Sequence, residues 1–157
     1  MATLKVKVPE NTQNIEGVAT IRAPLVKVFG AYTNEKLFAR WWCRGNPMTV
    51  HRFDCRDGGS WHIAEHSEDG HTHEFFGCFH EVAENTRIVQ TFEYMGMPER
   101  GHVLLERADF VAIDTNTTEI RTLGTAQSLA DRDGMIQSGA EAGWRQSVEA
   151  LGRLLEN

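Results

Sequence analysis

Apolar residues recur at steps of three and four along the C-terminal stretch, residues 131–157, which predicts one amphipathic helix. On the opposite side, acidic residues precede basic residues by four positions, as on a solvated helix face. At about 1.5 Å per residue this helix would run roughly 30–35 Å, so the rest of a small domain is expected to pack against it. The apolar stripe consists of Ile136, Ala140, Trp144, Val148, Leu151 and Leu155.

Two glycines, Gly139 and Gly143, lie inside this helical pattern just before Trp144. Each should cost about 1 kcal/mol relative to alanine in a helix interior. They indicate either a bend or close packing against another backbone, or space left for a bound molecule. The bend or close packing is the favoured interpretation.

Upstream of this helix the pattern is mostly that of strands. The β-branched residues within 15–22 predict a first strand, and Pro24 suits the first turn of a helix that runs to about residue 32. Asn34 can cap a second short helix over residues 35–40. Residues 1–14 are polar and irregular, and we expect a lead-in there, followed by a single domain over residues 15–157. Further strands are predicted over residues 49–53, 61–67, 71–82, 87–93, 102–113 and 118–125.

The hairpin over residues 61–82 can be aligned residue by residue. Residues 68–70 (Glu-Asp-Gly) have the composition of a three-residue turn that ends with a glycine in the left-handed conformation. This turn places Trp61 opposite Gly77. A two-residue turn would instead place Trp61 opposite Cys78; the first alignment is favoured because a glycine leaves room for a large indole.

Composition narrows the class of protein. A chain of 157 residues with net charge −6 and a pI near 5.6 has no basic surface, so neither nucleic acid nor a membrane is an expected partner. No window approaches about 18 uninterrupted apolar residues, and the N-terminus lacks a signal-peptide pattern, so we expect a cytoplasmic protein. The three cysteines, Cys43, Cys55 and Cys78, are few and widely spaced, which favours free thiols.

A series of short motifs follows the chain in order. They are Ala23-Pro24, Trp41-Trp42, residues 57–61 (DGGSW), 77–82 (GCFHEV), 87–92 (RIVQTF), 131–135 (DRDGM) and Gly143-Trp144. Together they resemble the bacterial AHSA1-like proteins (activator of Hsp90 ATPase homologues) of the START/Bet v 1-like (SRPBCC) superfamily, whose bacterial members are often described as polyketide cyclase-like. The resemblance implies an α+β helix-grip fold. In that fold a curved antiparallel sheet of about six or seven strands surrounds a long C-terminal helix, with two short helices after the first strand.

The resemblance leaves the function open, because this superfamily includes carriers, cyclases, hydrolases, sensors and co-chaperone domains on one scaffold. It implies an apolar cavity between sheet and helix, so the expected function is binding of a small, largely apolar ligand without chemical change. The first alternative is a polyketide cyclase-like or other enzyme acting on an aromatic or apolar substrate. The second is an Hsp90 ATPase activator, which is not expected because this chain has no room for the separate chaperone-binding domain of the eukaryotic activators. A homodimer through exposed strands is compatible with the sequence.

The candidate ligand-binding residues are the aromatic, methionine and small residues expected beside the cavity, although each taken alone more often fills a core. They are Trp41, Trp61, Ile63, Phe75, Phe79, Phe92, Met95, Met135, Gly139 and Trp144.

Candidate catalytic residues are fewer. The hairpin alignment places Glu65 opposite His73 on the more apolar face, where a carboxylate and an imidazole could act as a general acid/base pair. An ion pair that reaches water at the strand ends is the favoured alternative.

Several histidines are candidate metal ligands. His62 and His66 would share a strand face but lie about 13 Å apart, too far for one ion. His71 and His73 could reach each other, with Glu65 as a third ligand, but no compact set emerges, so neither a metal nor a cofactor is expected. No cysteine lies in a nucleophile motif, and His102 has no assigned role.

Overall fold

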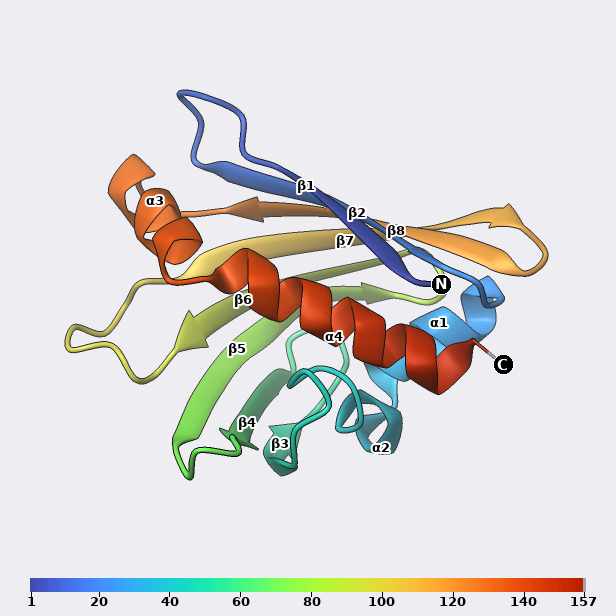
Figure 1. Cartoon of the computed structure of the whole chain (residues 1–157), viewed down its shortest axis with the longest axis horizontal. Helices are drawn as coiled ribbons and strands as arrows, with labels where there is room; N and C mark the ends of the chain where they lie inside the picture. Colours follow the sequence, from blue (N-terminus) through green and yellow to red (C-terminus); the bar gives the residue numbers. More distant parts are fainter. Residues whose placement is uncertain (157) are drawn as a thin grey trace.

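A computed structural model describes residues 1–156, and Asn157, the last residue of the predicted helix and domain, lies outside the described residues. Eight strands form one antiparallel sheet in the order β1-β2-β8-β7-β6-β5-β4-β3. The sheet curves round the C-terminal helix, as Figure 1 shows. The strands are β1 (Thr3–Lys7), β2 (Asn14–Ile21), β3 (Met48–Phe53), β4 (Ser60–His66), β5 (Thr72–Ala83), β6 (Arg87–Tyr94), β7 (Leu104–Asp114) and β8 (Thr117–Thr125).

The helices lie on one side of this sheet. α4 (Ala140–Leu155) crosses its concave face, α1 (Leu25–Thr33) and α2 (Glu35–Phe38) lie near the C-terminal end of α4, and α3 (Leu129–Gln137) lies near its other end (Figure 1). Asn34 caps α2 as predicted, since its Oδ1 accepts a hydrogen bond from the Leu37 N–H at 3.1 Å. The antiparallel sheet that curves round the C-terminal helix α4 confirms the predicted helix-grip fold. None of the helices in residues 1–156 is long and apolar enough to cross a membrane.

The prediction of one continuous C-terminal helix is wrong. The chain breaks between α3 and α4 at Gly139, whose φ is 86°. Glycine adopts this left-handed conformation without the steric cost that a side chain brings, and the Gly139 N–H donates to the Ile136 carbonyl to close α3. Within α4 the apolar stripe holds from Trp144 onward, where Val148 and Leu151 are buried against the core, whereas Ala140 is exposed.

The prediction of a loose lead-in over residues 1–14 also needs correction, because Thr3–Lys7 form the edge strand β1. Leu4 lies opposite Ala19 of β2 and is buried, whereas Lys5 points to solvent. This alternation at period two is the strand signal. With β1 the sheet has eight strands rather than about six or seven.

The predicted register of the β4–β5 hairpin is confirmed. Gly70 has a φ of 86°, and the Ser67 N–H donates to the His71 carbonyl at 3.0 Å. Trp61 lies opposite Gly77, where an added Cβ would be only 2.7 Å from the indole nitrogen. Glycine at position 77 therefore leaves the space that the indole of Trp61 needs.

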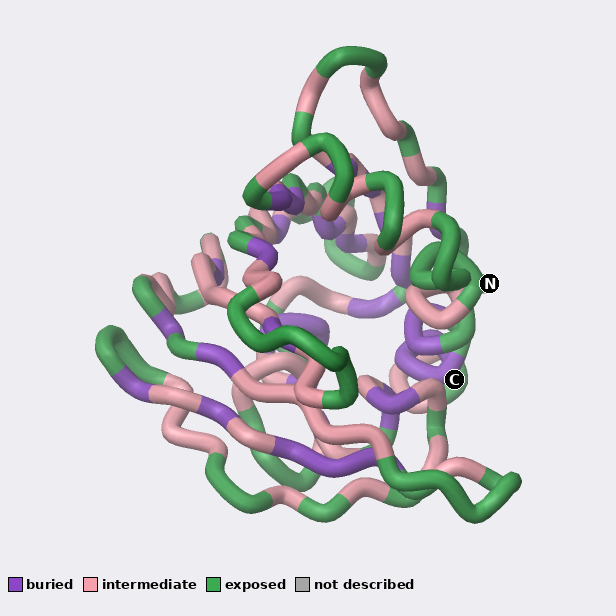
Figure 2. The backbone as a smooth tube through the Cα atoms, turned by 90° about the vertical axis from the view of Figure 1, so that its left-hand side faces the viewer, coloured by how far each residue is buried: buried purple, intermediate pink, exposed green. Residues whose placement is uncertain are grey.

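α4 packs most closely over β1 and β2. The indole of Trp144 lies over Gly17 of β2, and any side chain at that position would overlap it. Trp144 is half-buried and packs against the core, so its predicted place on the sheet-facing stripe is confirmed. Figure 2 shows the buried positions of α4 and of the strands around it in purple.

Candidate functional site

Aromatic side chains form a wall on the inner face of β4, β5 and β6. Trp42, from the loop after α2, stands against it, with its ring centroid 5.4 Å from those of Trp61 and Phe75 and 6.1 Å from that of Phe92. Ser147 of α4 donates a hydrogen bond from Oγ to the Trp42 carbonyl at 2.6 Å, which ties this loop to the helix. Trp42, Phe75 and Phe92 are only half-buried. Part of the aromatic surface therefore stays accessible on the concave side of the sheet.

Trp61 brings an unsatisfied polar atom to this wall. Its side chain is buried, and its indole N–H has no hydrogen-bond acceptor among the described residues. An unmet buried donor costs about 1–3 kcal/mol. The N–H is closed off from solvent against Gly77 of the neighbouring strand, so this cost is carried by the fold itself.

A carboxyl group lies further along the same inner face. Glu106 lies on β7 in phase with the buried residues Leu104 and Phe110, and Gln90 lies directly opposite on β6. The Gln90 amide donates from Nε2 to Oε1 of Glu106 at 3.4 Å. Burial raises the pKa of the Glu106 carboxyl to about 7, and the hydrogen bond from Gln90 lowers it by less. Protein surrounds Glu106, but its side chain keeps some accessible surface.

Tyr32 of α1 adds a phenol near the polar side chains of Gln90 and Glu106. Burial, and to a lesser extent the charge of Glu106, raises the pKa of the Tyr32 phenol. The Tyr32 ring centroid lies 4.6 Å from that of Trp41 and 5.0 Å from that of Phe110. The phenol therefore stays protonated, while Glu106 can either donate or accept a proton near neutral pH.

The side chains of Glu65 and His73, predicted as a pair, bind other partners. The two residues lie opposite each other, as predicted, but within residues 1–156 no hydrogen bond or ion pair joins them. Oε2 of Glu65 accepts from Nη2 and Nε of Arg44 at 2.7 and 3.0 Å and from the Asn46 amide at 2.8 Å. His73 instead pairs through Nδ1 with the Tyr94 hydroxyl at 3.0 Å. A guanidinium makes stronger, charge-assisted hydrogen bonds to a carboxylate than an opposed imidazole does.

The predicted ligand-binding residues divide by burial. Trp41 has a structural hydrogen bond, since its Nε1 donates to the Ala31 carbonyl at 2.9 Å. Gly139 is exposed at the start of α4. The buried members are Trp41, Trp61, Ile63 and Phe79, and the half-buried members are Phe75, Phe92, Met95, Met135 and Trp144.

Sequence reasoning missed four residues of this site: Tyr32, Trp42, Gln90 and Glu106. A signal was present for two of them. Gln90 lies between the apolar residues Ile88 and Phe92 at period two, as Glu106 does on its own strand. A polar residue in phase with inward-facing apolar residues indicates a polar atom aimed at the core.

The surface hollow beside α4 is polar rather than apolar. It has a volume of about 480 Å³ and lies between α4 and the β4–β5 turn. Hydrogen bonds from Ser67 and His71 hold the pKa of the Asp69 carboxyl, on this rim, well below its usual range. The hollow is lined by Arg44, Asn46, Ser67, Glu68, Asp69, Gln146, Glu149 and Arg153.

The histidines considered as metal ligands mostly have other partners. His66 pairs with the Thr49 hydroxyl at 2.7 Å, and His71 with Asp69 at 3.0 Å. His62 instead lies with His51 and Glu74 on the outer face of the sheet, and these three form the compact ligand set among residues 1–156 that the sequence did not predict.

Known proteins share this architecture. The family model described as "Activator of Hsp90 ATPase homolog 1-like protein" matches residues 22–156. The crystal structure of Ms6760 from Mycobacterium smegmatis is similar, with a TM-score of 0.86 at 19% identity over 99% of this chain and 97% of that one. A Rhodobacter sphaeroides protein gives a TM-score of 0.82 at 18% identity over 97% of each chain.

A third similar structure is DynU16, a protein of the dynemicin biosynthetic locus. Its TM-score is 0.65 at 15% identity, over 90% of this chain and 46% of DynU16. No curated protein matches the chain. At these identities the structural likeness shows a shared fold alone. The family model, however, spans most of the sequence, and the chain belongs to the family of activator of Hsp90 ATPase homolog 1-like proteins.

Proposed function

We propose that the protein binds a small, largely apolar molecule between the inner face of the sheet and α4, and that Glu106 meets a polar group of this molecule. The observation that carries the proposal is Glu106 itself, a carboxyl on an apolar inner face. Among residues 1–156 its one side-chain hydrogen bond comes from the neutral amide of Gln90, at 3.4 Å. A carboxyl with so few partners lowers the stability of the protein when no ligand is bound. A packing role at this position would be filled better by leucine or alanine.

The surrounding residues narrow the class of ligand. The partly accessible rings of Trp42, Phe75 and Phe92 favour a flat, aromatic body. Glu106, near its pKa of about 7, can pair with a donor or an acceptor of the ligand. An aromatic molecule that carries hydroxyl or carbonyl groups, as aromatic polyketides do, meets each of these requirements.

A thermal-shift screen of apolar metabolites and aromatic polyketides tests this function. A ligand at hundredfold excess over its dissociation constant stabilises the fold by about 2.7 kcal/mol, which raises the melting temperature measurably. For each hit, quenching of tryptophan fluorescence gives the dissociation constant in the wild type, in Glu106→Gln and in Glu16→Gln, a control on the outer face of β2. Equal affinity in all three proteins, or no hit from a broad screen, would overturn the proposal.

An enzyme of the polyketide cyclase-like type is the second candidate. The observation that favours it is the pKa of Glu106 near 7, because a general acid or base works best when its pKa is near the working pH. Mass spectrometry of each hit after incubation separates the two functions. A changed product, formed by the wild type but not by Glu106→Gln while binding persists, would establish catalysis.

A co-chaperone function is tested separately, since the family description refers to the Hsp90 ATPase. Because the proposed ligand site lies on the inner face of the sheet, no stimulation of chaperone ATPase activity is expected. Dose-dependent stimulation by the folded protein, absent after the domain is unfolded, would contradict this expectation.

A further inference from the structure

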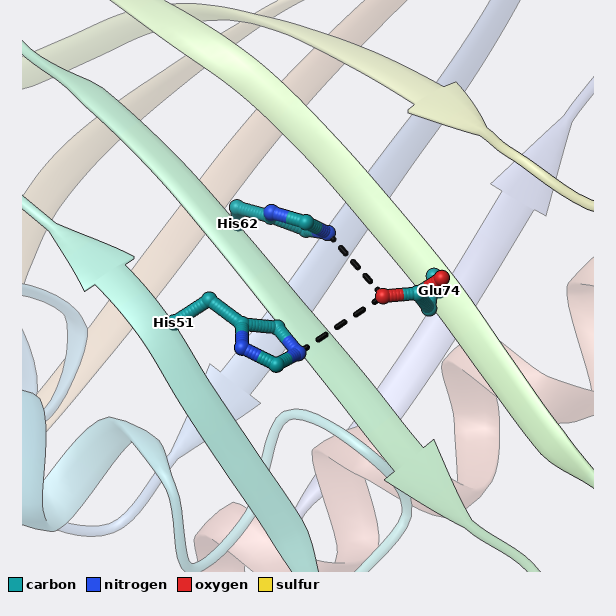
Figure 3. Close-up of side chains that lie close together, drawn as sticks. All are labelled: His51, His62 and Glu74. Atoms are coloured by element: carbon teal, nitrogen blue, oxygen red, sulfur yellow. Dashed lines mark hydrogen bonds and ion pairs between the residues drawn. The ribbon is translucent and has the colours of Figure 1, made fainter.

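Three ligand-type side chains gather on the outer face of the sheet, on the side away from α4. Nε2 of His62 lies 3.2 Å from Oε1 of Glu74, and Nε2 of His51 lies 3.6 Å from the same oxygen. The three ligand atoms all lie within 4.8 Å of one another. In Figure 3 both imidazoles point at the carboxylate, and the three side chains come from three adjacent strands.

An irregularity in β3 builds this cluster. The pairing of β3 with β4 shifts between Val50 and Arg52, so that His51 and Arg52 together lie opposite His62. Such a bulge changes the direction of one side chain. Glu74 of β5 is paired with Ala64, two residues beyond His62, and lies diagonally across from that histidine.

We propose that His51, His62 and Glu74 bind a divalent transition-metal ion, with Zn²⁺ as the best-matched ion. Imidazole nitrogen and carboxylate oxygen are the donors that zinc uses together, at bond lengths of about 2.0–2.2 Å. Two ligands of a tetrahedral ion with such bonds stand roughly 3.4 Å apart, close to the 3.2 and 3.6 Å found here. Three protein ligands leave the fourth position to water, as in open zinc sites.

The surroundings allow an ion to enter. The side chains of His51, His62 and Glu74 are 45%, 27% and 41% exposed, so none must be uncovered first. The nearest cation in the sequence, Arg52, directs its guanidinium to the Ser60 hydroxyl at 3.2 Å. The two imidazole rings lie 4.6 Å apart, centre to centre, beside a single carboxylate. A bound ion would join β3, the edge strand opposite β1, to β4 and β5.

Metal titration of the purified full chain tests the site. The protein is treated with a chelator, dialysed, and titrated at pH 7.5 with Zn²⁺ against a chromogenic competitor and, separately, with Co²⁺. All proteins carry Cys78→Ser, because this exposed thiol on β5 is an alternative ligand. The test variants are His62→Gln and Glu74→Gln, and the matched control is His80→Gln, an exposed histidine of the same sheet. Circular dichroism checks that each variant is folded.

The expected result is one Zn²⁺ per chain, and visible Co²⁺ absorption bands of a four-coordinate site. Affinity should fall at least about tenfold in His62→Gln and in Glu74→Gln, because loss of a ligand costs no less than loss of its supporting contacts. The His80→Gln control should stay within about twofold of the parent. The proposal is overturned if no saturable binding is found, if both test variants keep the parent affinity, or if the control loses affinity equally.

Discussion

Glu65 on β4 and Glu106 on β7 both point to the inner face of the sheet, but they have different partners. Glu65 accepts three hydrogen bonds, two from the Arg44 guanidinium and one from the Asn46 amide. Within the described part of the chain Glu106 accepts one, from the neutral Gln90, and burial raises its pKa to about 7. A carboxylate with a full set of partners holds the fold together, whereas one that lacks them is available to a ligand. The partners of an inward-facing acid therefore separate structure from function better than its position on the sheet does.

The largest expected effect is the loss of the partner of Glu65. Arg44→Met leaves Glu65 buried without a cation, and the free energy of unfolding should fall by about 3–4 kcal/mol, the lower end for a buried pair because Arg44 is itself partly exposed. Urea unfolding measures this change. The double variant Arg44→Met/Glu65→Met should recover most of the loss, and a double variant as unstable as Arg44→Met would show that Arg44 acts by packing.

The second effect is a gain in stability rather than a loss. The folded-state pKa of Glu106, about 7, lies above its ordinary value of 4.5, so the stability contributed by the protonated carboxyl is lost as pH rises from 4.5 to 7. Glu106→Gln removes this loss, and the variant should be more stable than the wild type at pH 8 by up to about 3 kcal/mol. Urea unfolding at pH 5 and pH 8 checks it. A variant that is less stable at pH 8 would contradict an enclosed, uncompensated carboxyl.

The third effect is on binding. For an aromatic ligand with a hydroxyl group, Glu106→Leu should weaken affinity about tenfold, equivalent to about 1.4 kcal/mol, because the polar group loses its partner. Glu65→Gln should change the affinity little, because the three hydrogen bonds that Glu65 accepts all come from the protein itself. Fluorescence titration of both variants makes the comparison. A larger loss in Glu65→Gln would reverse the roles assigned to the two acids.

The smallest effect belongs to a partly exposed pair. The carboxylate of Asp131 on α3 pairs with Nδ1 of His102 at 3.1 Å and raises the pKa of this imidazole. The stability from this pair is complete below the ordinary pKa of 6.5 and is lost as pH rises through the raised value. Asp131→Asn should bring the pKa of His102 back toward 6.5, as measured by NMR titration. An unchanged pKa would show that other acids, such as Glu99, determine it.

Local rules predicted much of the backbone. The turn that ends in Gly70 determined the hairpin register, and the Asn34 cap determined the start of α2. The C-terminal helix was predicted as continuous because its apolar stripe runs on across Gly139, and the stripe says nothing about a left-handed residue. The edge strand β1 was missed because five residues with alternating lysines give a weak signal.

Side-chain partners were harder to predict than faces. The alignment placed Glu65 and His73 opposite each other correctly, but Arg44 comes from a loop in which it has a φ of 59°. The direction of a guanidinium from such a loop depends on the whole fold. The cluster of His51, His62 and Glu74 was missed for a similar reason, since it requires the bulge in β3.

The break at Gly139 gives α3 a different kind of stability from that of α4. No residue of α3 is buried. Polar contacts hold this helix in place, from Arg132 to the Pro9 and Thr12 carbonyls and from Asp131 to His102. The amide hydrogens of α3 should therefore exchange with solvent through local opening, at rates that low concentrations of denaturant hardly change. Those of α4 around the fully buried Leu151 should exchange only when the whole sheet unfolds.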